Sequence, residues 1–173
     1  MQARPWLLFL ALASTQSLSA QAPAAPSSAS TPSVYISADE IAQTLQQSIK
    51  NNVVDQPVKA MDVVAPSGHR ASLALLRRTK EETNALVHVR VTEIYQIVEG
   101  AGTLVTGGSL GNPQGTDLTR LNAGPSLTGV HQGGESRRVG PKDVIIIPAG
   151  TPHRFSALDG PITYLVYRFE PKP

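Results

Sequence analysis

The sequence predicts a mostly β-stranded domain, a sandwich or a barrel, that follows one amphipathic helix. Three observations support this fold class. Apolar residues recur at helical spacing in one segment, residues 37–51. From residue 57 onward, short apolar segments alternate with turns rich in glycine, proline and polar residues. About nine such segments in one domain favour an all-β sandwich or barrel.

The first twenty residues have the composition of a secretory signal peptide. Arg4 supplies a positive charge, residues 6–13 are apolar, and residues 17–20 offer small side chains for cleavage. The apolar run is shorter than the about 20 residues that a transmembrane helix needs. We expect cleavage after Ala20, with Ala22 as the less favoured site. The mature protein is then periplasmic or secreted and has no contact with a membrane.

The rest of the chain reads as a linker and one domain. Residues 21–33 are rich in alanine, proline and serine, which predicts a disordered linker, and residues 34–173 are enough for a domain with its own core. The chain has no cysteine, so no disulfide stabilises it. Its 15 Lys and Arg residues barely exceed its 13 Asp and Glu residues, and this balance does not favour nucleic acid as a partner.

The helix is predicted at residues 37–51. Ser37 and Glu40 have the spacing of a capping box, in which each side chain bonds the other residue's backbone amide. The apolar stripe of this helix consists of Ile41, Leu45 and Ile49. A single amphipathic helix must pack its stripe on another element, and we expect it to pack on the sheet that follows.

Nine segments are predicted as the strands of a barrel that extends over residues 57–170. They share a short length, an apolar or β-branched composition and flanking turn residues. These segments are residues 58–64, 69–77, 85–91, 93–98, 102–106, 137–139, 143–147, 153–157 and 162–169.

Residues 107–135 are predicted as a long glycine-rich loop. A loop of this length is usually either functional or disordered. Two interpretations stay open for it: a mobile excursion on the surface, and a lid over the mouth of the barrel.

The segment DVIIIPAGTPH places a histidine at a fixed distance from a proline and a glycine. A buried strand ends at Pro148, the chain turns at Gly150, and His153 begins the next strand. This spacing resembles the second motif of the cupin family, G-x5-P-x-G-x2-H-x3-N. Lys142 replaces the first glycine of that motif and Ala157 replaces its final asparagine.

The first cupin motif, G-x5-H-x-H-x3,4-E-x6-G, is matched in part. Glu93 and Gly100 have its E-x6-G spacing, and a four-residue spacer places His88 at the second histidine and Leu86 at the first. In the alternative registration, His88 comes first, Arg90 comes second, and the spacer is shorter. The resemblance covers about residues 86–157 and implies a single jelly-roll β-barrel, here with one N-terminal amphipathic helix.

The resemblance also implies a metal site formed by His88, Glu93 and His153. Two imidazoles and one carboxylate are the ligands of the facial triad that holds non-haem Fe(II), and Mn, Ni, Cu or Zn accept them as well. The implied cofactor is therefore a divalent transition metal of open identity. The alternative is that these side chains are a hydrogen-bonded polar cluster in a barrel that no longer binds metal.

Three further residues are candidates for contact with a small-molecule ligand. Because side chains alternate along a strand, Tyr95 should share the inner face with Glu93, and Arg90 should share a face with His88. His131 would supply a fourth ligand to the metal ion if the glycine-rich loop covers the mouth of the barrel. Core packing for Tyr95 and a solvated rim position for Arg90 are the competing interpretations.

Two functions stay open at this point. The first is an exported, metal-dependent cupin enzyme, an oxygenase or an isomerase, that acts on a small organic molecule. The second is a non-catalytic cupin that binds a sugar or another metabolite and has a degenerate metal site. In either case the resemblance implies a homodimer.

Overall fold

The computed structural model describes residues 33–63 and 68–172 of the 173-residue chain. The predicted signal peptide and nearly all of the predicted linker lie outside these residues. Within them, no helix has the length and apolar character needed to cross a membrane.

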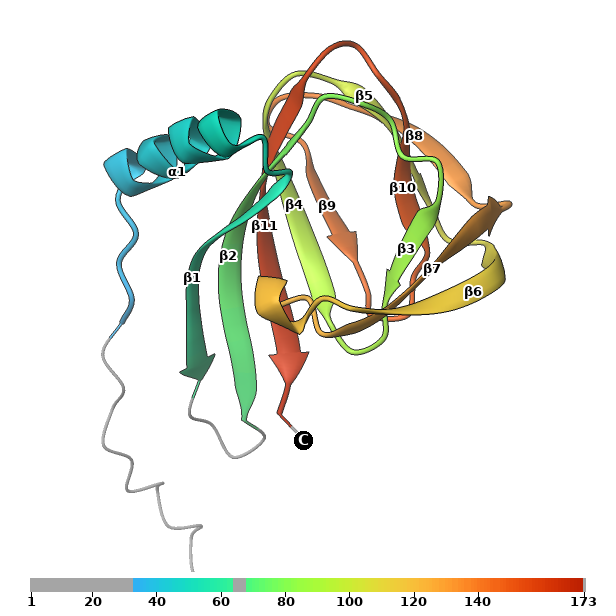
Figure 1. Ribbon diagram of the computed structural model, residues 1–173, viewed down its shortest axis with the longest axis horizontal. Helices are drawn as coiled ribbons and strands as arrows, with labels where there is room; N and C mark the ends of the chain where they lie inside the picture. Colours follow the sequence, from blue (N-terminus) through green and yellow to red (C-terminus); the bar gives the residue numbers. More distant parts are fainter. Residues whose placement is uncertain (1–32, 64–67, 173) are drawn as a thin grey trace, which may run out of the picture. The chain divides into compact units, whose positions relative to one another are not determined.

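One α-helix precedes a series of strands (Figure 1). The helix α1 spans Ala38–Asn51. The strands are β1 (Asp55–Val63), β2 (His69–Arg78), β3 (Ala85–His88), β4 (Thr92–Glu99), β5 (Gly102–Thr106), β6 (Ser109–Asp117), β7 (Pro125–Gln132), β8 (Glu135–Val139), β9 (Val144–Ile147), β10 (His153–Leu158) and β11 (Ile162–Pro171), and a 3-10 helix, η1 (Thr119–Leu121), lies between β6 and β7.

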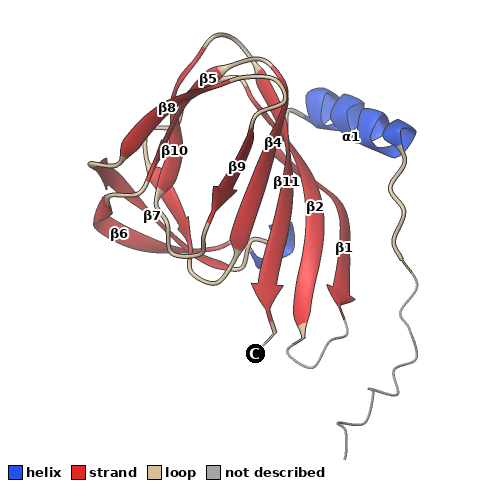
Figure 2. Cartoon of the chain, turned by 180° about the vertical axis from the view of Figure 1, so that it is seen from behind, coloured by secondary structure: helices blue, strands red, loops and turns tan. Residues whose placement is uncertain are grey.

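The strands form two antiparallel sheets. One has the order β1-β2-β11-β4-β9, and the other has the order β6-β7-β3-β10-β5-β8. Figure 2 shows the two sheets facing each other, with α1 on the outer side of β1 and β2. The prediction of an all-β jelly-roll barrel with one helix is confirmed.

The core lies between the two sheets because alternate residues of each strand point inward. On β4 the buried positions are Glu93, Tyr95 and Ile97, and the residues between them face outward. Residues of the other strands complete the core, among them Leu104, Val139, Ile147, Phe155, Ile162, Tyr164 and Val166. A charged or polar side chain at an inward-facing position of a strand, such as Glu93, is therefore buried in an otherwise apolar interior.

The helix begins as predicted, but its packed stripe differs in the last turn. The Ser37 hydroxyl accepts a hydrogen bond from the backbone amide of Glu40 at 3.1 Å, and Ile41 and Leu45 pack on the outer face of the sheet. Ile49 is 46% exposed, whereas Ser48 is buried. The prediction for Ile49 was wrong because position 48 falls closer to the packed face at 3.6 residues per turn.

The prediction that residues 107–135 form a loop was also wrong. These residues contain β6, η1 and β7, and β7 pairs with β3 on one side and with β6 on the other. Glycine permits this pairing: a Cβ atom on Gly129 would lie only 2.6 Å from the carbonyl oxygen of Gly111. The segment is therefore part of the barrel wall and not a loop over its mouth.

Candidate metal centre

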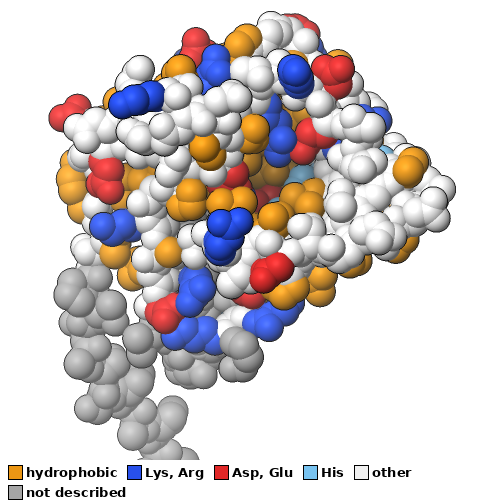
Figure 3. All heavy atoms as spheres, viewed as in Figure 1, with side chains coloured by type: hydrophobic (Ala, Val, Ile, Leu, Met, Phe, Trp, Pro, Cys, Tyr) orange, Lys and Arg blue, Asp and Glu red, His pale blue; other side chains and the backbone are white. Residues whose placement is uncertain are grey.

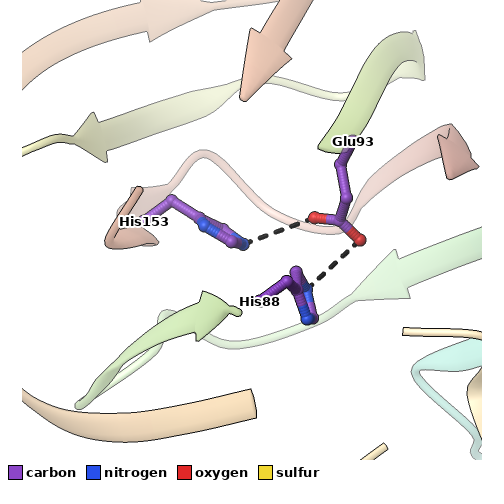
Figure 4. A group of neighbouring side chains, drawn as sticks. All are labelled: His88, Glu93 and His153. Atoms are coloured by element: carbon purple, nitrogen blue, oxygen red, sulfur yellow. Dashed lines mark ion pairs between the residues drawn. The ribbon is translucent and has the colours of Figure 1, made fainter. Parts of the chain in front are cut away.

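Three strands bring His88, Glu93 and His153 together. His88 is the last residue of β3, Glu93 lies near the start of β4, and His153 is the first residue of β10. All three side chains are buried, and one ligand atom from each lies within 4.8 Å of the others. The prediction that these residues share one site agrees with this arrangement (Figure 4).

The turn between β9 and β10 fixes the backbone around both histidines. Pro148 follows β9, and Gly150 has a φ of 80°, a left-handed conformation that suits glycine. The amide of Gly150 donates a hydrogen bond to the carbonyl oxygen of His88 at 2.8 Å. The proline–glycine spacing of the second motif therefore positions His88 as well as His153.

Both imidazoles point toward one carboxylate. The Nε2 atom of His88 lies 3.3 Å from Oε1 of Glu93, and the Nε2 atom of His153 lies 3.4 Å from Oε2. Figure 4 shows the two rings approaching the carboxylate from different strands. Each carboxylate oxygen thus faces one imidazole nitrogen.

The outer nitrogens of both rings face oxygen atoms. Nδ1 of His153 lies 3.0 Å from the carbonyl oxygen of Thr151, which can only accept a hydrogen bond. Nδ1 of His88 lies 2.8 Å from the hydroxyl of Ser126, and that hydroxyl is within 3.3 Å of two backbone carbonyl oxygens, to which it donates. Both Nδ1 atoms therefore carry hydrogen. Each ring presents the Nε2 lone pair to Glu93 when it is neutral, and donates a hydrogen bond from Nε2 when it is protonated.

Glu93 stays ionised in this environment. Its own burial would raise the pKa of Glu93, but the hydrogen bond and charge that His88 can supply, and then the charge of Arg168, hold that pKa well below its usual range. Burial lowers the pKa of His153 below the usual imidazole value, which favours the neutral ring. A proton on His88 or a metal ion beside the carboxylate would satisfy the same electrostatic requirement.

Tyr95 belongs to this site, as its parity predicted. Its hydroxyl donates a hydrogen bond to Oε2 of Glu93 at 3.0 Å, and its ring meets that of His153 edge to face, with 6.0 Å between the centroids. Burial, and then the charge of Glu93, raises the pKa of Tyr95 well above its usual value. The phenol is therefore a neutral hydrogen-bond donor.

Two predicted ligand-binding residues lie elsewhere. The guanidinium of Arg90 donates to the carbonyl oxygen of Pro171 at 2.6 Å and lies 3.7 Å from the Glu170 carboxylate. The Nε2 atom of His131 lies 2.8 Å from the carbonyl oxygen of Gly107. These contacts place Arg90 at a partly exposed position on the rim and His131 in the β6–β7 ladder, and neither contact involves the metal group.

Two side chains of the site escaped sequence reasoning. Arg168 is buried on β11, directly opposite Glu93 on β4, and its Nε donates to Oε1 of Glu93 at 2.8 Å. The sequence does mark Arg168, because it is the one charged residue in the apolar segment ITYLVYRF and shares the parity of the inward-facing residues. Ser126 was missed because it lies in the segment predicted as a loop.

One further sequence pattern, G-x-S-x-G, lacks the structural context of a catalytic serine. Residues 107–111 read GGSLG, which matches the G-x-S-x-G pattern of nucleophilic serines. A nucleophile elbow needs a sharp turn from a strand into a helix. Here Ser109 begins β6, and its hydroxyl contacts the side-chain oxygen of Gln132 at 3.4 Å. The structure gives this serine no partner that would activate it among the described residues.

The donor set and its charge fit a divalent metal ion. Two carboxylates, Asp55 and Glu93, share the single guanidinium of Arg168. With neutral imidazoles, the cluster carries one negative charge that no described contact balances. Buried charges need a partner, and nitrogen and carboxylate donors are those of Fe, Mn, Ni, Cu and Zn sites. In the space-filling view, histidine, acidic and basic side chains are visible in a hollow of the surface (Figure 3).

Comparisons with known proteins find similar folds but no similar sequence. No family model matches the chain, and no curated protein matches it. Among solved structures, the chain is similar to the DMSP lyase DddQ from Ruegeria pomeroyi (18% identity, TM-score 0.36, 64% of this chain and 45% of the lyase). It is also similar to a protein from Bacillus halodurans (17% identity, TM-score 0.45, 82% of this chain and 85% of that protein). A third similar structure is a cupin superfamily protein from Desulfitobacterium hafniense (13% identity, TM-score 0.33, 66% of this chain and 77% of that protein).

These similarities concern the fold alone, and the chain spans less than half the length of the lyase. The fold class follows from the chain itself. Two facing antiparallel sheets, the P-x-G-x2-H turn between β9 and β10, and the His–Glu–His group on the inner wall define a jelly-roll barrel with a candidate metal site.

Proposed function

We propose that the protein binds a divalent transition-metal ion through His88, Glu93 and His153, and a small organic molecule beside that ion. One observation carries this proposal. The two Nε2 atoms meet the two oxygens of one buried carboxylate, while acceptors on the far side of each ring hold the Nδ1 hydrogens. Such outer contacts fix the tautomer and the orientation that a metal-binding imidazole needs.

Electrostatics support a cation at this point. When no cation is bound and both imidazoles are neutral, the lone pair of each ring faces a carboxylate oxygen at 3.3 or 3.4 Å, an unfavourable approach of two acceptors. A divalent ion removes this conflict and balances the negative charge that Asp55 and Glu93 leave after pairing with Arg168.

The proposed activity is that of an oxygenase or an isomerase. A bound metal ion would polarise a substrate oxygen or activate dioxygen. The chain's own groups supply the rest: three ligands leave coordination positions open for a small molecule, and Tyr95 keeps a neutral phenol beside the carboxylate. Tyr95 also belongs to the buried hydrophobic cluster that contains Ile97 and Phe155.

A second function is favoured by one contact. The Nε of Arg168 already donates to Oε1 of Glu93, so a cationic group lies beside the carboxylate without any metal. On this alternative, the polar cluster is a remnant of a metal site, and the barrel binds a sugar or another metabolite without catalysis. Export and a homodimer stay predictions for both functions.

The deciding experiment is metal analysis by mass spectrometry on protein purified without a histidine tag. We expect near-stoichiometric Fe, Mn, Ni, Cu or Zn in the wild type, and loss of that metal in His153→Ala and in Glu93→Ala with the barrel still folded. Matched controls are His69→Ala and Glu99→Gln, whose positions lie outside the metal group. A wild-type protein that contains no metal, and takes up none when metal is added, would support the non-catalytic binding function instead.

A further inference from the structure

Arg168 is held from three sides inside the barrel. Its Nε donates to Oε1 of Glu93 at 2.8 Å, and its Nη2 donates to Oδ2 of Asp55 at 2.6 Å. Its Nη1 donates to the carbonyl oxygen of Leu121 at 2.7 Å. The guanidinium therefore joins β11 to β4, to the first residue of β1 and to η1.

The partners of Arg168 leave it little freedom. Its side chain is 3% exposed, and that of Asp55 is 15% exposed. A guanidinium presents its donors in one rigid plane, so three acceptors at fixed places define its orientation. Burial of an ion pair is costly and adds little net stability, so such pairs are weak evidence for a purely stabilising role. The more specific effect of this arrangement falls on the Glu93 carboxylate.

We infer that Arg168, anchored by Asp55, is a positioning residue of the metal centre and sets the orientation of the Glu93 carboxylate between the two imidazoles. This inference rests on the proposed function, because it assigns Arg168 a role toward the metal ligands. Tyr95 holds the other carboxylate oxygen, Oε2, at 3.0 Å. Glu93 is thus fixed at both oxygens before any ion arrives.

The test compares Arg168→Lys with Arg78→Lys by titration with Co(II), whose visible absorption reports its coordination. A lysine at position 168 keeps the charge but cannot hold Glu93, Asp55 and Leu121 at once. Loss of such an outer partner typically weakens metal binding by about 10- to 100-fold. We expect a weakening of that size in Arg168→Lys, with an altered spectrum at saturating Co(II).

Arg78→Lys is the matched control. Arg78 is also a mostly buried barrel arginine, but it pairs with the Tyr164 hydroxyl at 2.7 Å and with Glu82 at 2.9 Å. We expect wild-type Co(II) affinity and spectrum in this variant. An equal change in both variants would mean that Arg168 acts only through the stability of the barrel.

Asp55→Asn provides a milder variant if Arg168→Lys does not fold. It keeps the contact between Arg168 and Glu93 but removes the anchoring charge, so we expect a smaller loss of Co(II) affinity in the same direction. If the variants that fold keep the wild-type Co(II) affinity and spectrum, the positioning role is wrong and the proposed metal site is unaffected. A wild type that binds no Co(II) would remove the proposed function and this inference together.

Discussion

Tyr95 and Glu93 lie two residues apart on β4, and a hydrogen bond of 3.0 Å joins the phenol hydroxyl to the carboxylate inside the barrel. The alternation of a strand places both side chains on its inner face. An ionised acceptor in a dry interior makes such a bond stronger than one between neutral groups. The stability of the barrel should therefore respond to this single hydroxyl.

Tyr95→Phe tests that expectation. A hydrogen bond to a charged group contributes about 1.5–3 kcal/mol, so we expect the free energy of unfolding of the metal-free protein to fall by an amount in this range. Urea denaturation measures it. The control is Tyr167→Phe, because the Tyr167 hydroxyl bonds the exposed Gln96 side chain at 3.0 Å. We expect the control to change stability by less than about 0.5 kcal/mol, and equal losses in both variants would contradict the prediction.

Ser126→Ala should weaken metal binding without unfolding the barrel. The Ser126 hydroxyl accepts the hydrogen on Nδ1 of His88, and its removal frees that ring to rotate. We expect zinc affinity to fall by about tenfold or more, as measured by competition with a chromophoric chelator. Ser136→Ala, at an exposed position on β8, is the control and should bind zinc like the wild type. Unchanged affinity in Ser126→Ala would exclude this serine from the site.

Acid should destabilise the metal-free protein through His153. Burial depresses the pKa of His153 in the folded state. The contribution of the neutral His153 ring to the free energy of unfolding is therefore fully present above the unfolded pKa of about 6.5, and it is lost as the pH falls through the folded pKa. We expect the urea midpoint of the wild type to fall more steeply between pH 7 and pH 5 than that of His153→Gln. Parallel curves for the two proteins would contradict this assignment.

The glycines of the β6–β7 ladder should differ in their tolerance to alanine. A Cβ atom on Gly129 would lie 2.6 Å from the carbonyl oxygen of Gly111, whereas a Cβ on Gly115 would meet nothing within 4 Å. We expect Gly129→Ala to lose about 1–3 kcal/mol of unfolding free energy, the usual cost of overpacking. Gly115→Ala, in the same hairpin, should be neutral in the same urea experiment. A neutral Gly129→Ala would show that the two strands can separate without cost.

Motif spacing predicted a group of residues that the structure brings together, His88, Glu93 and His153, because the P-x-G turn and the strand parity are local properties. Glu93 and Tyr95 share a face by alternation alone, and His153 follows Gly150 by a fixed number of residues. The fold class followed for the same reason. Short apolar segments and turn residues act over a few positions, and a single sequence displays them directly.

The rest of the site depends on pairing between distant strands. Arg168 meets Glu93 only because β11 lies beside β4, and Ser126 meets His88 only because β7 lies beside β3. The glycines of residues 107–135 hid β6 and β7, since glycine is rare in strands and common in turns. Arg90 was misplaced because β3 ends at His88, so strand parity does not extend to position 90.

The position of β11 has a consequence for the order in which the site can form. This strand comes last among the described elements, yet it lies between β2 and β4, with Ile162 opposite Arg78 and Arg168 opposite Glu93. While the chain emerges from the ribosome, β2 and β4 have no partner on these edges until residues 162–171 are made. The carboxylate of Glu93 thus receives its guanidinium only after residue 168 has been made, and pairings this distant in sequence are slow to form.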